Sequence, residues 1–173
     1  MRILLQFHFK MNESFFSKYV LLSRIGKGSF GEIFRCEEVS TSKKKAVKVA
    51  IHSNSNVKQL INEIMTYRQI QGGVGIPNIF WYGNEGNATV MVMDLLGTNL
   101  EDLFNKQKRN FTIKTVLLLA DQMISRVEFL HKKGFVHHDI KPENFVFGNS
   151  NENSKILYLI DYGLSKRYID QTT

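Results

Sequence analysis

The sequence predicts an α+β fold in which a β-rich part with one helix comes first and a helical part follows. Alternating apolar residues with turn residues between them predict strands within 19–50, and Val57–Gln71 has the apolar spacing of a helix. After Gly97 the pattern becomes mainly helical. A chain of 173 residues suits one domain that buries about 70% of its unfolded surface. We therefore expect one domain with two lobes and a hinge at 94–98.

The first lobe is predicted to contain five strands around one helix. Glycine-rich and Ser/Thr/Lys turns separate the first three strands, and Gly72-Gly73 ends the helix Val57–Gln71. The turn GNEGN separates the last two strands. The expected strands are Tyr19–Ile25, Glu32–Glu38, Lys45–Ala50, Ile79–Tyr82 and Thr89–Met93.

The second lobe is predicted to begin with two helices, Asn99–Lys106 and Thr112–Lys133. Thr112 can cap the longer helix, and Gly134 stops it. The apolar residues of this helix cover more than one face, so we expect it to be buried on several sides. Two strand-like segments follow, at Phe145–Phe147 and Ile156–Ile160.

Charge and cysteine content narrow the classes of partner. A net charge of +7 favours nucleic acid, acidic membrane or acidic and phosphorylated protein as partners. The longest basic run, Lys43–Lys45, is more typical of a solvated hairpin than of a nucleic-acid site.

Cys36 is the one cysteine, so no intrachain disulfide forms, which fits a reducing compartment. No apolar run reaches the roughly 18 residues of a spanning helix, and the first ten residues lack a signal-peptide pattern. We expect neither a nucleic-acid partner nor a membrane span.

The stretch IGKGSFGEIF places three glycines in a turn between two predicted strands. Alone, Gly26-x-Gly28-x-x-Gly31 is a weak signal, because turns often contain glycine. In a dinucleotide-binding fold it would open a helix, but residues 32–38 are strand-like. A glycine-rich hairpin can instead lie over phosphates with its backbone N–H groups close to them.

Two charged residues follow this hairpin. Lys48 lies on a predicted strand and points away from Val47 and Val49, and Glu63 lies on the following helix. Packed together, they could form an ion pair that holds the lysine at a phosphate. Each alone is more typical of a solvated surface residue.

The stretch HHDIKPEN is more specific. Asp139 could accept a hydroxyl proton, Lys141 could neutralise phosphate, and Asn144 could hold Mg²⁺. Asp161 ends an apolar strand in IDYG and could be a second Mg²⁺ ligand. A His-His-Asp zinc site would need ligands that the rest of this loop does not supply.

The order of these motifs resembles the signature set of the eukaryotic protein kinases over residues 19–165. The strings QGGVGIPNIFWYG, VMVMDLLGTNLEDLF, LADQMISRVEFLH and IKPENF are similar to the casein kinase one family. The vaccinia-related kinases are the nearest alternative, with a poorer match to these strings. The resemblance implies a protein-kinase-like fold with a complete β-rich N-lobe and the first part of a helical C-lobe.

The resemblance also implies roles for individual residues. Catalysis falls to Asp139 as base and Lys141 at the γ-phosphate, with Lys48 on the α- and β-phosphates supported by Glu63. Asn144 and Asp161 hold Mg²⁺. The residues expected around ATP, including Met93 as gatekeeper and the backbone of 94–96 as hinge, are Ile25, Gly26, Lys27, Gly28, Gly31, Ile33, Ala46, Lys48, Met93, Asp94, Leu96 and Val146.

Two positions depart from the usual pattern. His138 stands where most of these kinases have an arginine that meets the activation segment, and an imidazole lacks the bidentate fork of arginine. His137 is expected to be structural and to pack near Asp161. Tyr162 replaces a phenylalanine, so its added hydroxyl needs a partner or water.

The expected organisation is an N-terminal extension 1–18, then a partial kinase domain 19–173 with N-lobe 19–93, hinge 94–98 and partial C-lobe 99–173. The sequence stops shortly after Asp-Tyr-Gly. Two functions stay open: a serine/threonine kinase acting with ATP and Mg²⁺ on acidic or phosphorylated proteins, or a non-catalytic ATP-binding fragment or interaction module. We expect the cytoplasm, the nucleus or both as its location.

Overall fold

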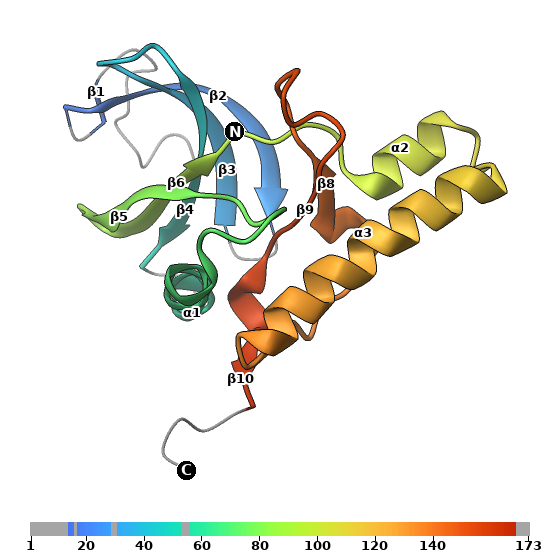
Figure 1. Cartoon of the computed structure of the whole chain (residues 1–173). Helices are drawn as coiled ribbons and strands as arrows, with labels where there is room; N and C mark the ends of the chain where they lie inside the picture. Colours follow the sequence, from blue (N-terminus) through green and yellow to red (C-terminus); the bar gives the residue numbers. More distant parts are fainter. Residues whose placement is uncertain (1–13, 16, 29–30, 53–55, 169–173) are drawn as a thin grey trace.

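The N-terminal lobe is a six-stranded antiparallel sheet in the order β1-β2-β3-β4-β6-β5 (Figure 1). The computed structural model describes residues 14–15, 17–28, 31–52 and 56–168. All five predicted strands are present with slightly wider bounds, and β1 is additional, formed by residues that we assigned to the extension. The strands are β1 (Ser14–Phe15), β2 (Tyr19–Gly28), β3 (Gly31–Glu38), β4 (Lys44–Ile51), β5 (Ile79–Glu85) and β6 (Ala88–Asp94).

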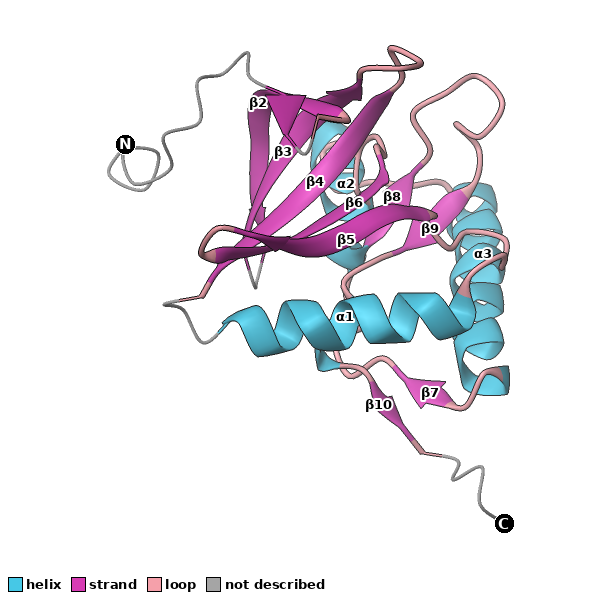
Figure 2. Ribbon diagram, turned by 90° about the vertical axis from the view of Figure 1, so that its left-hand side faces the viewer, coloured by secondary structure: helices cyan, strands magenta, loops and turns pink. Residues whose placement is uncertain are grey.

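Helix α1 (Asn56–Ile70) lies between the sheet and the C-terminal lobe. Figure 2 shows it below β5 and above the short pair β7–β10. Its residues Leu60, Ile64 and Tyr67 recur at helical spacing and are buried in the main core. Gly72 follows the helix with φ +82°, a left-handed conformation that glycine adopts without strain.

The C-terminal lobe contains α2 (Leu100–Lys106) and α3 (Ile113–Lys132) with short strands beside them. Asn99 and Thr112 are the caps rather than the first helical residues, since their side chains accept bonds from Asp102 N at 2.7 Å and Thr115 N at 3.2 Å. The remaining elements are β7 (Phe135–Val136), η1 (Pro142–Asn144), β8 (Phe145–Phe147), β9 (Leu157–Leu159), η2 (Tyr162–Leu164) and β10 (Lys166–Arg167).

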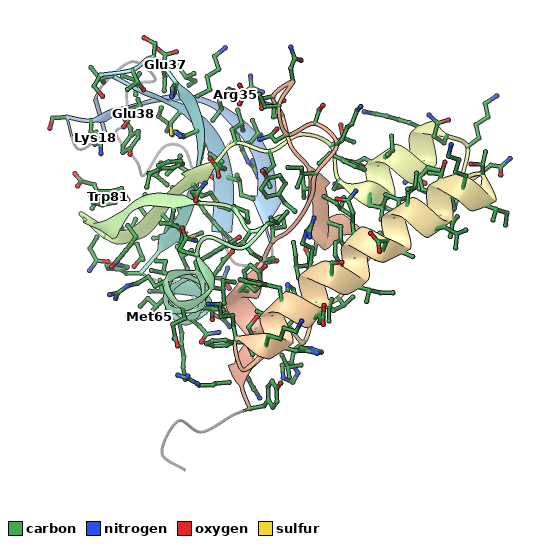
Figure 3. The ribbon with its side chains drawn as sticks, viewed as in Figure 1. Lys18, Arg35, Glu37, Glu38, Met65 and Trp81 are labelled. Carbon is green, nitrogen blue, oxygen red and sulfur yellow. The ribbon has the colours of Figure 1, made fainter. Side chains whose placement is uncertain are left out.

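One hydrophobic core runs through both lobes. It joins Ala46 and Met91 of the sheet to Tyr67 of α1 and to Phe145 and Tyr162 of the C-terminal lobe. A second cluster includes Val47 and Val92 of the sheet, with Trp81 packed against it. Lys18, Glu37 and Glu38 gather at the end of the sheet far from α3 (Figure 3). The predicted α+β class is confirmed, and the shared core fixes the two lobes against each other.

Helix α3 is less buried than we expected. Its buried residues are Leu119, Arg126 and Leu130, whereas Ile113 is 78% exposed and Ile124 is 68% exposed. Buried Arg126 donates to the Leu157 carbonyl at 2.9 Å, which fixes α3 against β9. The expectation of burial on several sides is wrong for the described residues, because one stripe of the helix packs and the other apolar positions face outward. Among the described residues, no helix has the length and apolar character needed to cross a membrane.

The exposed side of α3 predicts that the isolated 173-residue chain self-associates, since soluble monomers rarely expose large contiguous apolar patches. Replacing both Leu117 and Ile124, which are largely exposed, by glutamine should increase the monomer fraction and shift the free energy of unfolding by no more than about 0.5 kcal/mol per site. Light scattering after size exclusion, over a range of concentrations, measures the monomer fraction. The control Lys114→Gln removes no apolar area and should behave as wild type. A wild-type chain that stays monomeric throughout would contradict this prediction.

Candidate active site

A cavity of about 490 Å³ opens between the two lobes. Strands β2, β3 and β4, helix α1, the 94–98 hinge, β8 and the segment after β9 all contribute to its wall. The lining residues are Ile25, Gly26, Ile33, Ala46, Lys48, Glu63, Met93, Asp94, Leu95, Leu96, Gly97, Asn99, Lys141, Glu143, Asn144, Val146, Ile160 and Asp161.

Most predicted site residues therefore share one cavity. Leu95 was predicted only as part of the hinge backbone 94–96, and Gly97 only as part of the hinge segment 94–98. Asn99, Glu143 and Ile160 were not predicted, although each lies close in sequence to a residue that was. Asp139 is outside the lining but is bonded to Lys141, which is part of it.

Three charged side chains meet at the back of this cavity. Lys48 Nζ lies 2.6 Å from Glu63 Oε2 and 3.1 Å from Asp161 Oδ1, and the three residues are 4%, 1% and 8% exposed. They come from β4, from α1 and from the residues after β9. Charges are rarely buried unless they are paired, so each partner here depends on the others.

The two carboxylates keep Lys48 charged. Burial disfavours its ammonium, but attraction to Glu63 and Asp161 and the bonds to them outweigh burial, so the pKa of Lys48 lies above its ordinary value. Burial raises the pKa of Glu63, against the opposing attraction of Lys48. Lys48 is therefore a fixed cation at neutral pH in the cavity wall.

Backbone conformation directs Asp161 toward this cluster. Its φ and ψ are 69° and 61°, a left-handed conformation that costs an L-residue about 1–2 kcal/mol. The following Tyr162 is fully buried, with its ring 4.8 Å from that of Tyr67 and 5.1 Å from that of His137. Its hydroxyl donates to the Leu159 carbonyl at 3.0 Å. The partner required by the hydroxyl at position 162 is therefore a backbone oxygen.

Asp139 is held by its own loop. Its Oδ2 accepts from Lys141 Nζ at 2.7 Å and from Asn144 Nδ2 at 3.0 Å, and Asn144 Nδ2 also donates to the Asp139 carbonyl at 2.8 Å. Partial burial would raise the pKa of Asp139, but these bonds hold it below the usual value. The hydrogen bond that Lys141 donates to Asp139 raises the pKa of Lys141. The loop thus presents an ionised carboxylate next to a fixed ammonium.

Asn144 and Asp161 suit a magnesium ion. The Asn144 amide nitrogen already donates to Asp139, so its oxygen is the atom that remains for a cation. Ile160 N donates to the Asn144 carbonyl at 3.0 Å, and Asn144 directly precedes β8 while Asp161 comes shortly after its partner strand β9, so both predicted ligands line the cavity near the same strand pair. An amide and a carboxylate oxygen fit the preference of Mg²⁺. Within the described ranges, no group of three or more His, Cys, Asp and Glu residues could hold a metal.

The described strands of the glycine-rich hairpin border the cavity. Gly26 lines it, and Gly28 at the end of β2 pairs with Gly31. A Cβ on Gly31 would lie 2.3 Å from the Val49 carbonyl oxygen, so only glycine allows β3 to approach β4 here. The side chain of Lys27 and the hairpin tip at 29–30 lie outside the described residues.

The predicted hinge is fixed at both ends. The Asp94 carboxylate accepts from the backbone and side-chain nitrogens of Asn78 at 2.8 and 3.0 Å. At the other end, Gly97 N donates to the Phe147 carbonyl at 2.8 Å. The side chain of Asp94 is thus engaged with Asn78, while residues 94–97 line the cavity.

The adjacent histidines have different environments. His137 is buried, its Nε2 lies 3.0 Å from the Ile160 carbonyl, and its Nδ1 accepts from Asp139 N at 3.2 Å. Both ring nitrogens are therefore occupied, which excludes a metal-ligand role and fixes Nε2 as the protonated nitrogen. His138 is exposed and has φ 67°.

Protonation of His137 predicts a pH dependence of stability. Burial is the main cause that lowers its pKa, and a second ring proton would displace the Asp139 N–H. Below about pH 6.5 the unfolded chain binds a proton that the folded ring does not, so stability falls as pH falls from that value toward the lower folded pKa. Denaturant unfolding between pH 7 and pH 5 measures this slope.

The variant His137→Gln should show a smaller slope over this interval. His138→Asn is the control, because asparagine tolerates the left-handed backbone and the position is exposed; it should keep the wild-type slope. An unchanged slope in His137→Gln would show that another group titrates.

A family model described as protein kinase domain matches residues 19–173. The match covers nearly all of the chain and starts at the first residue of β2, so the predicted kinase-like fold, with its sheet-rich first lobe, is confirmed. It includes the cavity, the charged cluster and the Asp139 loop described above. The chain belongs to the protein kinase family, and it is a kinase, an ATP-binding transferase.

Proposed function

We propose that this kinase is a Mg²⁺-dependent serine/threonine kinase of casein kinase one type. It transfers the γ-phosphate of ATP to hydroxyl groups of acidic or previously phosphorylated proteins. The observation that carries the proposal is the pairing of Asp139 with Lys141 at 2.7 Å, at the edge of the cavity that contains the Lys48 cluster. A carboxylate that can orient a hydroxyl thus lies beside a cavity whose lining includes Lys48 and Lys141.

In this proposal different groups of residues bind the phosphates, the base and the metal ion of ATP. Gly26, Lys27, Gly28 and Gly31 cover the phosphates, and Ile25, Ile33, Ala46 and Val146 enclose the base beside the hinge. Lys48 binds the α- and β-phosphates, and Glu63 keeps its ammonium in place. Asn144 and Asp161 would hold Mg²⁺, which would offset the negative charge of the phosphates.

Asp139 receives the acceptor hydroxyl. Its carboxylate is ionised at neutral pH because Lys141 and Asn144 hold its pKa low. It therefore accepts a hydrogen bond from the substrate hydroxyl and turns the oxygen toward the γ-phosphate. It takes up the hydroxyl proton as the new P–O bond forms and the bond from the γ-phosphorus to ADP breaks, so that ADP leaves. Lys141 reaches the same γ-phosphate from the loop.

Charge and sequence similarity support the substrate class and the branch. The net charge of +7 favours acidic or phosphorylated proteins over basic ones. The segments 71–83, 90–104 and 119–131 resemble the casein kinase one family. We place the protein in the cytoplasm, the nucleus or both, where a single cysteine stays reduced. Burial raises the pKa of the Cys36 thiol to about 12, so this thiol is unreactive at neutral pH.

A non-catalytic ATP-binding module is the second candidate. Ile140 of the catalytic loop is 49% exposed and lines an open apolar groove with α3. A loop that lacks packing on one side can lose the precise geometry that phosphotransfer needs, because small misplacements cost large factors in rate. Nucleotide binding without turnover would favour this candidate.

We predict that Asp139→Asn lowers phosphotransfer by about a hundredfold or more and changes ATP affinity little, since Asp139 acts on the hydroxyl and not on the nucleotide. Lys48→Ala should instead weaken binding of Mg²⁺·ATP, because a cavity cation is lost. Transfer of labelled phosphate to an acidic and to a basic protein measures turnover and substrate preference, and calorimetric titration measures nucleotide affinity.

The control is Lys155→Ala, which replaces an exposed lysine outside the cavity lining. Equal nucleotide affinity in wild type and Lys48→Ala would refute the proposed phosphate site, and preference for the basic protein would refute the substrate class.

A further inference from the structure

Asn62 joins helix α1 to the segment that follows Asp161. Its side-chain nitrogen donates to the carbonyls of Gly163 at 2.9 Å and Ser165 at 3.0 Å, with a longer contact to the Tyr162 carbonyl at 3.4 Å. Asn62 immediately precedes Glu63, and Tyr162 immediately follows Asp161. The residues next to the two carboxylate partners of Lys48 are therefore bonded to each other.

The carbonyls that Asn62 reaches belong to a turn that cannot satisfy them itself. Helix η2 spans only Tyr162–Leu164, and Ser165 N donates to the Tyr162 carbonyl at 3.0 Å, a local bond that engages neither the Gly163 nor the Ser165 carbonyl. Gly163 and Ser165 are buried, so their carbonyls need donors from within the protein. Two N–H groups on one side-chain amide supply them.

We propose that Asn62 is a positioning residue of the Mg²⁺·ATP site. By fixing the segment after Asp161 to α1, it keeps Asp161 and Glu63 at the spacing that lets both contact Lys48. That the ligand is Mg²⁺·ATP rests on the proposed function. The hydrogen bonds from Asn62 of α1 to the segment after Asp161 can be tested without any ligand.

Nothing local in α1 favours asparagine at this position. Asparagine is a poorer helix former than alanine, since its side chain competes for backbone hydrogen bonds. The variant Asn62→Ala should therefore support α1 at least as well as wild type. A loss of function in this variant points to the missing bonds and not to the helix.

Other contacts hold the segment to the C-terminal lobe and keep the test local. The Tyr162 hydroxyl donates to Leu159, and Ser165 Oγ donates to the His137 carbonyl at 3.4 Å. These contacts remain when Asn62 is replaced. The segment should stay folded against the C-terminal lobe but become uncoupled from α1.

The experiment compares wild type with Asn62→Ala and Asn62→Asp. Asp has the shape of Asn but no donor, and its charge would face carbonyl oxygens. The control is Met65→Ala, an exposed side chain one turn further along α1 (Figure 3). Hydrogen exchange of the amides in 162–168 reports whether this segment is still held to α1. Titration of an ATP analogue with and without Mg²⁺ reports the affinity of the proposed Mg²⁺·ATP site.

In both Asn62 variants the amides of this segment should exchange about tenfold faster, and the analogue should bind about fivefold more weakly with Mg²⁺, as expected for the loss of one partly buried hydrogen-bonding group. The loss without Mg²⁺ should be smaller, because Asp161 acts through the ion. The control should match wild type in both measurements.

Unchanged exchange in both Asn62 variants would overturn the inference, whatever the nucleotide affinity. Faster exchange with an unchanged Mg²⁺ dependence would overturn the positioning role. A wild-type chain that binds no analogue would contradict the proposed function, and the exchange data would still decide whether Asn62 ties α1 to the segment.

Discussion

The buried contact of Lys48 with Glu63 and Asp161 is the constraint on which the rest of this structure depends. A single ammonium holds together a strand of the sheet, helix α1 and the segment after β9, at 2.6 and 3.1 Å. Removing one partner from a buried charge group leaves an uncompensated charge, which is strongly unfavourable. The position of α1 and the left-handed turn at Asp161 are therefore linked to each other through Lys48.

The surrounding packing supports the same arrangement. Tyr162 lies between Tyr67 of α1 and His137 of the loop that contains Asp139, and His137 is bonded on both ring nitrogens to Ile160 and Asp139. A continuous set of contacts thus connects α1 to the carboxylate proposed to receive the substrate hydroxyl. The charged cluster and this loop both contribute residues to the lining of the cavity.

The regular elements could be predicted from sequence because their signals are local. Strand alternation, the cap Thr112, and Gly72 and Gly134 gave the main elements to within a few residues. Lys48 and Glu63 each resemble surface residues, and only their order relative to Asp139 and Asp161 indicated a shared site.

The features that the sequence analysis missed depend on tertiary contacts. In the sequence, Asn62 is an ordinary polar residue of a helix. Its hydrogen-bond partners lie about a hundred positions later in the chain, so no local pattern indicates them. The two-residue strands β7 and β10 are too short for a periodic signal. The burial of α3 depends on which elements cover it, and its apolar pattern alone overestimated that cover.

The most direct measurement of the central claim is a double-mutant cycle of unfolding free energy with Lys48→Met and Glu63→Gln. Lys48→Met leaves two carboxylates close together and buried, which should cost about 3–5 kcal/mol. Adding Glu63→Gln removes one of those charges. The account predicts that the double variant is more stable than Lys48→Met alone, with a coupling energy of about 1 kcal/mol or more. Additive effects of the two substitutions would contradict it.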